Sequence, residues 1–192
     1  MALRIKSRWH DSGRNEATEK TLSDHAGALA FILWRLALDK AKTLHGEDYV
    51  YTSDGQRIAI ICEYLAFGVQ VVDRLAYLRE MPEDEREFFV NAFASRATDH
   101  VEDNAVDLFG PGDYRTGFTK TLNKRLQEYS EYSFTKAGPG YSFLRLLGVK
   151  CQAIMNKGDA PHMNRWVIDQ VMEKDAPDVV QKLESSVDDL LG

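Results

Sequence analysis

Apolar side chains recur at three- and four-residue steps along almost the whole chain, and this spacing is what most limits the folds open to it. In residues 19–44 these positions are Leu22, Ala26, Leu29, Ala30, Leu33, Leu36 and Ala37. Such spacing places one apolar stripe along an α-helix, whereas a half-buried strand alternates every second residue. The strand-like run at 49–52 is too short to build a sheet without partners. The pattern therefore predicts an all-α protein.

Glycine, proline and capping residues divide this helical pattern into about six segments. The predicted helices cover residues 19–44, 54–80, 82–109, 113–134, 141–156 and 161–191. Ser53 or Asp54, and Asp113, are suited to cap helix N-termini. The Gly-Pro-Gly sequences at 110–112 and 138–140 are interpreted as helix stops, and Pro177 as a kink or break in the last helix. We expect a single-domain bundle of about six helices with short Gly/Pro turns.

The charge of the chain is divided between a basic start and an acidic body. The 192 residues carry a net charge of −6, yet Arg4, Lys6, Arg8 and Arg14 are opposed within residues 1–14 by Asp11 alone. This predicts a basic, flexible arm at 1–15 and one helical domain at 16–192. The arm is either a solvated terminus or a contact for an acidic surface. The acidic body argues against a nucleic-acid-binding protein, which needs a concentrated basic face.

Cysteine use and hydropathy indicate a cytoplasmic protein. Cys62 and Cys151 lie far apart in apolar surroundings, which is typical of free thiols in a reducing compartment. Residues 1–14 lack the apolar core of a signal peptide. The apolar stretches at 27–38 and 58–72 are shorter than the roughly 20 residues that span a bilayer, so we expect no transmembrane segment.

Polar residues on the second and third predicted helices suggest a shared seam. The turn near Met81 makes these helices antiparallel, and counting from it places Glu63 level with His100. On the second helix the polar stripe holds Glu63, Gln70 and Arg74, and the matching line on the third helix is Arg96, His100, Asp103, Asn104 and Asp107.

The seam has a chemical interpretation and a structural one. A metal-dependent or acid/base enzyme could use His100 as a nitrogen ligand for a divalent metal, with Glu63, Asp103 or Asp107 as oxygen ligands. However, the chain has no Glu-x-x-His or His-Glu-x-x-His sequence. In the structural interpretation, the stripe is simply the solvent-facing or polar line of a mostly buried helix. That interpretation assigns no catalytic residue and no cofactor.

Aromatic residues gather near the end of the fourth predicted helix and beyond it. They suggest a partner or pocket surface, and the alternative is ordinary core packing with tyrosine hydroxyls reaching water. The candidate residues are Tyr129, Tyr132, Phe134, Tyr141 and Trp166.

The last helix carries a separate apolar stripe after Pro177, which could dock on its own core or on a second copy of the chain. Since the sequence contains no nucleophile elbow or phosphate-binding loop, we expect a non-enzymatic interaction, assembly or small-ligand-binding module, forming a dimer or binding a protein partner. The alternative is the enzyme built on the polar seam.

Overall fold

The computed structural model describes residues 20–45, 49–156 and 164–191 of the chain. Within these residues the fold is a helical bundle, as the spacing predicted. The elements are α1 (Leu22–Thr43), α2 (Asp54–Leu78), α3 (Glu83–Phe109), α4 (Tyr114–Ser130), β1 (Phe134–Thr135), β2 (Gly138–Pro139), α5 (Tyr141–Met155), α6 (Trp166–Gln170), the π-helical turn η1 (Val171–Asp175) and α7 (Ala176–Leu191). The basic arm at 1–15 lies outside the described residues.

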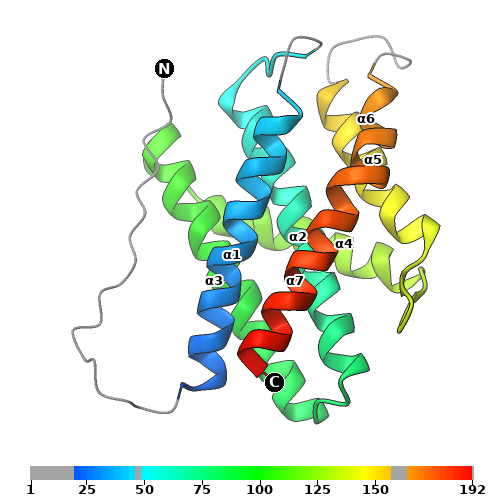
Figure 1. Cartoon of the computed structure of the whole chain (residues 1–192). Helices are drawn as coiled ribbons and strands as arrows, with labels where there is room; N and C mark the ends of the chain where they lie inside the picture. Colours follow the sequence, from blue (N-terminus) through cyan, green and yellow to red (C-terminus); the bar gives the residue numbers. More distant parts are fainter. Residues whose placement is uncertain (1–19, 46–48, 157–163, 192) are drawn as a thin grey trace.

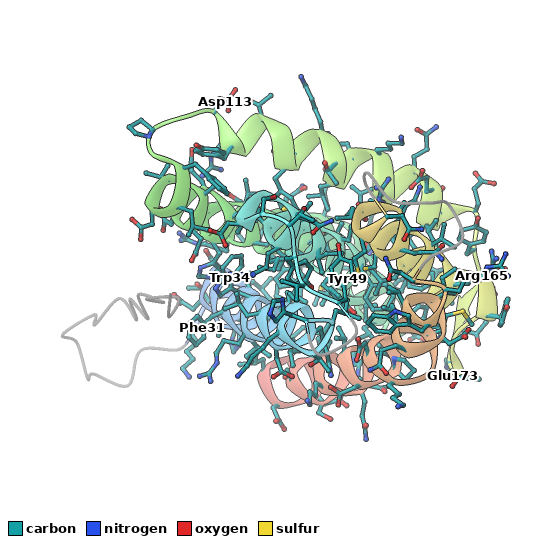
Figure 2. The ribbon with its side chains drawn as sticks, turned by 90° about the horizontal axis from the view of Figure 1, so that it is seen from above. Phe31, Trp34, Tyr49, Asp113, Arg165 and Glu173 are labelled. Atoms are coloured by element: carbon teal, nitrogen blue, oxygen red, sulfur yellow. The ribbon has the colours of Figure 1, made fainter. Side chains whose placement is uncertain are left out.

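Helix α2 is the centre of the bundle, because it contacts α1, α3, α4, α5 and α7. Figure 1 shows α7 crossing in front of α2, with α1 on the left of α7. Seen from above, α4 and α7 form opposite faces of the molecule, with α1, α2 and α5 between them (Figure 2). This central position explains why α2 is apolar around most of its circumference, since side chains in nearly every direction are buried.

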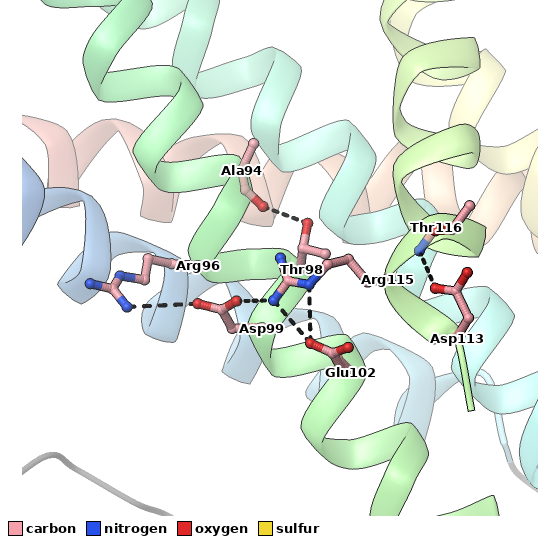
Figure 3. Close-up of polar contacts among 8 residues, drawn as sticks. All are labelled: Ala94, Arg96, Thr98, Asp99, Glu102, Asp113, Arg115 and Thr116. Atoms are coloured by element: carbon pink, nitrogen blue, oxygen red, sulfur yellow. Dashed lines mark hydrogen bonds and ion pairs between the residues drawn. The ribbon is translucent and has the colours of Figure 1, made fainter. Parts of the chain in front are cut away.

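Helix boundaries follow the predicted capping residues. The Ser53 hydroxyl accepts a hydrogen bond from the backbone N–H of Gln56, and the Asp113 carboxylate accepts one from Thr116. Gly110, at φ 85°, ends α3 in a backbone conformation that favours glycine. Ion pairs of Arg115 with Asp99 and Glu102 then fix the start of α4 against α3 (Figure 3).

The predicted fourth helix is too long, and the second Gly-Pro-Gly does not end a helix. Helix α4 ends at Ser130, and the chain then makes a small antiparallel hairpin in which Phe134 pairs with Pro139 and Thr135 with Gly138. Gly140, the last residue of that Gly-Pro-Gly, caps the start of α5. Polar and aromatic residues alternate at 130–134, and this alternation does not continue the helical spacing. The prediction of a helix as far as residue 134 overlooked that signal.

The last helical segment deviates before Pro177 rather than at it. Residues 171–175 form a π-helical turn that leads directly into α7, and Pro177, which has no N–H to donate to the preceding turn, is the second residue of α7. The apolar stripe of α7 packs on the chain's own α1 and α2, with Val179, Leu183 and Val187 almost fully buried. The predicted start of this segment, at 161–163, lies outside the described residues.

None of the described helices combines the length and the apolar composition needed to cross a membrane. The two cysteines of the chain are free thiols, as expected. Burial raises the pKa of the Cys62 thiol to about 12 and that of Cys151 well above its usual range, so both are protonated at neutral pH.

Candidate functional site

The hairpin between α4 and α5 forms one wall of a pocket. Its tight turn needs Gly138, whose φ of 101° is rarely adopted by other residues, and the N–H of Gly140 donates to the Ser133 carbonyl (2.9 Å). Phe134 anchors the hairpin by an edge-on contact with Phe143 of α5, with ring centroids 5.4 Å apart. The hairpin is therefore fixed by backbone geometry and by an aromatic contact.

The pocket has a volume of about 600 Å³ and lies between this hairpin, the end of α2, the start of α5 and α7. That volume is within the range of small-molecule sites, roughly 300–1,000 Å³. Most of the larger side chains around it are apolar: Leu75, Leu78, Phe134, Pro139, Leu144, Pro177 and Val180. Thr135, Gln181 and three charged residues supply the polar part of the lining.

The three charged residues of the pocket are Arg79, Lys136 and Glu184. Arg79 already has partners within the protein, because its guanidinium donates hydrogen bonds to Asp188 on α7 and to the Leu75 carbonyl. Lys136 lies on the hairpin and Glu184 on α7, and both are exposed. Within the described part of the chain, neither has a hydrogen-bond or ion-pair partner. The pocket thus has an apolar lining and two charges of opposite sign without partners.

The aromatic residues predicted as a pocket or partner surface are divided by the structure. Phe134 lines the pocket, whereas Tyr129 is fully buried in the core against Phe67 and Phe143. Burial raises the pKa of the Tyr129 hydroxyl well above its usual range. Tyr132 is half-buried, and Tyr141 and Trp166 are exposed outside the pocket. Only Phe134 of the five contributes to the hollow.

In the structure, the residues that were predicted to form the polar seam contact several different helices. Glu63, 4% exposed, accepts hydrogen bonds from Arg125 of α4 at 2.5 and 2.6 Å. Arg125 also binds Glu128, which is bonded to Lys150 of α5. These carboxylate hydrogen bonds raise the pKa of the Arg125 guanidinium, with Glu63 the largest cause. Glu63 is therefore held in a structural ion-pair network that joins α2, α4 and α5.

His100 faces α1 instead of Glu63. Its ring stacks on Trp34 with centroids 5.7 Å apart and lies 6.1 Å from the ring of Phe31. Removal from water lowers the pKa of His100, while Asp103 and Asp99 act in the opposite direction. The expectation that Glu63 and His100 lie level considered only their height along two helices, and the structure shows that they point to different neighbours.

The other seam residues also lack a common centre. Gln70 is buried in α2, and the buried Nε of Arg74 has no hydrogen-bond partner in the described part of the chain. On α3, Arg96 pairs with Asp99, and Asn104 donates to the His100 carbonyl of its own helix. Asp103 and Asp107 are exposed.

No group of three or more His, Cys, Asp or Glu side chains among the described residues is arranged to hold a metal ion. The structure therefore gives the proposed metal ligands Glu63, His100, Asp103 and Asp107 no shared coordination site in that part of the chain.

A buried polar cluster that the sequence analysis missed lies at the π-helical turn. Asp175, 2% exposed, accepts hydrogen bonds from Tyr64 (3.0 Å) and Gln170 (3.2 Å), and Lys40 lies 4.0 Å away. Burial raises the pKa of the Asp175 carboxyl despite these partners. In the sequence, this cluster could have been suspected from Lys40, a charged residue three positions after the buried Ala37 in the first helix. Because Tyr64 lies on α2 and Lys40 on α1, these contacts fix η1 against both helices.

Comparison of the chain with protein-family models, curated proteins and solved structures found no significant match. Function is therefore argued from the residues of this chain.

Proposed function

We propose that this protein is a non-enzymatic binding module that holds a small, largely apolar ligand in the pocket beside the hairpin. The observation that supports this proposal is the apolar lining, in which three helices and the hairpin contribute side chains to one hollow of about 600 Å³. A second hollow, between α1 and α7, has four polar residues among its six lining residues. The hairpin pocket is thus the better place for an apolar ligand.

The enzyme alternative has less support from the same geometry. Its carboxylate, Glu63, is neutralised by Arg125, and its histidine is stacked on Trp34. An acid/base pair must reach one substrate position together, and these two side chains are engaged by different helices.

The proposal is tested with N-phenyl-1-naphthylamine, an uncharged probe whose fluorescence increases in apolar surroundings. We expect saturable binding with one site per chain. Leu78→Trp or Leu144→Trp places a larger ring in the pocket and should reduce probe affinity at least tenfold, with the helical circular dichroism unchanged. Tyr77→Trp is the matched control, because Tyr77 is 63% exposed and does not line the pocket. Equal probe binding in the wild type and both filled variants would refute the proposal.

A second candidate function, self-association into a dimer, is favoured by the end of α3. Val106, Leu108 and Phe109 are 37%, 38% and 47% exposed there, and Phe109 contacts the Tyr114 ring across the turn. Several exposed apolar residues at one end of a helix are typical of an interaction surface.

Sedimentation over a range of protein concentrations tests this second candidate. We expect a monomer–dimer equilibrium that Phe109→Glu shifts towards monomer. Tyr141→Glu serves as the control, since it places the same charge at another exposed aromatic position. A wild-type protein that stays monomeric at all concentrations would exclude this dimer.

A further inference from the structure

The charged residues of the pocket carry information about its ligand that the apolar lining does not. Arg79 shares its guanidinium with Asp188, so its charge is compensated within the protein. Lys136 and Glu184 remain, one positive and one negative, on two different elements around the same hollow. In the described residues neither charge is compensated by a neighbouring side chain.

From this arrangement we infer that the pocket takes a small zwitterion with an apolar body, such as a short apolar peptide with free amino and carboxyl ends. The inference rests on the proposed function, because it requires the pocket to bind a ligand. The carboxylate of such a ligand accepts hydrogen bonds from the Lys136 ammonium, and its amino group donates to the Glu184 carboxylate. Both are charge-assisted hydrogen bonds, which are stronger than neutral ones.

The apolar lining accounts for the rest of the ligand. Leu78, Leu144 and Val180 offer aliphatic surface, and removing apolar surface of the ligand and the pocket from water favours binding. A purely anionic ligand would leave Glu184 without a partner, and a purely cationic ligand would leave Lys136 without one. A ligand with both charges is the one that compensates both residues.

Isothermal titration calorimetry at pH 7 with three related probes tests the inference. The probes are leucyl-leucine, which is zwitterionic, N-acetyl-leucyl-leucine, which is an anion, and leucyl-leucinamide, which is a cation. We expect leucyl-leucine to bind at least fivefold more tightly than either blocked peptide. Equal affinity for the three peptides would overturn the inference, and so would a blocked peptide that binds most tightly.

Charge exchange in the protein provides the second part of the test. Lys136→Glu and Glu184→Lys should each weaken leucyl-leucine binding at least fivefold, because each leaves two like charges at the pocket. The double variant again has one charge of each sign, with their positions exchanged. It should therefore recover most of the affinity for leucyl-leucine, with the peptide bound in the opposite orientation. A double variant as weak as the single variants would contradict the inference.

The controls place the same charge changes outside the pocket. Lys124→Glu on α4 and Glu173→Lys in η1 alter exposed residues that do not line it, and both should bind leucyl-leucine as the wild type does. If they weaken binding as much as the pocket variants, net charge explains the effect and the inference fails.

The uncharged naphthylamine probe separates the two proposals. If that probe binds and the filled variants lose it, while the three peptides bind equally, the apolar pocket is retained and the zwitterion inference fails. If neither the probe nor any peptide binds, the proposed function fails with it.

Discussion

Arg125 holds Glu63 through two hydrogen bonds, 2.6 Å from Nε and 2.5 Å from an outer guanidinium nitrogen, and this pair joins α4 to α2. Both side chains are largely removed from water, with exposed fractions of 12% and 5%. A buried ion pair of this kind fixes how two helices are placed. Its net contribution to the free energy of unfolding is small, because replacing both residues with apolar ones of similar size is often neutral or stabilising.

Breaking this pair should destabilise the protein far more than removing it completely. Arg125→Leu leaves a buried carboxylate without its main partner and should lower the free energy of unfolding by about 3–5 kcal/mol. The double variant Glu63→Leu/Arg125→Leu removes both charges and should cost much less. Urea unfolding followed by circular dichroism measures both values. Arg115→Leu is the control, since its exposed ion pairs contribute only about 0–1 kcal/mol. A double variant at least as unstable as Arg125→Leu would contradict this explanation.

Two glycines in helix interiors should respond to alanine in opposite directions. A Cβ at Gly68 would lie 2.4 Å from a methyl carbon of the buried Leu33, so Gly68→Ala forces that side chain to shift within the packed core and should cost about 1–3 kcal/mol. Gly27 has nothing within 4 Å of the same position, so Gly27→Ala should stabilise by about 0.5–1 kcal/mol through helix propensity. Thermal unfolding of the two variants checks the sign. If both are stabilised, the close packing of Gly68 on Leu33 is wrong.

The stability of the protein should decrease as pH falls below about 6.5, the ordinary pKa of histidine, in part because of His100. Its folded-state pKa is lowered by burial, so the unfolded chain binds its proton at a higher pH than the folded chain. The contribution is complete above the unfolded pKa and is lost as pH falls through the folded pKa. His100→Phe keeps an aromatic ring on Trp34 and should flatten this part of the curve of unfolding free energy against pH. An unchanged slope in that variant would assign the effect to other groups.

Tyr64→Phe should destabilise the core at pH 7 by about 1.5–3 kcal/mol, because Asp175 loses a hydrogen bond to its buried carboxylate. Since that bond favours the ionised form, the pKa of Asp175 should rise further. The cost of the substitution should therefore shrink as the pH falls through that pKa. Unfolding at pH 7 and pH 4 measures the difference. Tyr51→Phe is the control, because its hydroxyl donates to the neutral Ala41 carbonyl and should show less pH dependence.

Local patterns were sufficient for most helices but not for the hairpin. Apolar spacing and the residues Ser53, Gly110 and Asp113 act within one or two turns, so they predicted the boundaries of α2, α3 and α4 where those residues lie. The hairpin depends on Phe134 contacting Phe143 and on Gly138 reversing the chain, and the first of these is a contact between different elements. Of the residues that line the pocket, only Phe134 was therefore named as a candidate from the sequence.

The sequence by itself determined that the chain is helical, where most helices begin and end, and that α2 is buried on nearly all sides. These properties follow from side-chain spacing and capping, which act between near neighbours. Only the tertiary structure decided that Glu63 meets Arg125, that His100 meets Trp34, and that Lys136 and Glu184 line one pocket. Height along a helix can be counted from a turn, but the neighbour that each side chain faces depends on how the other helices pack around it.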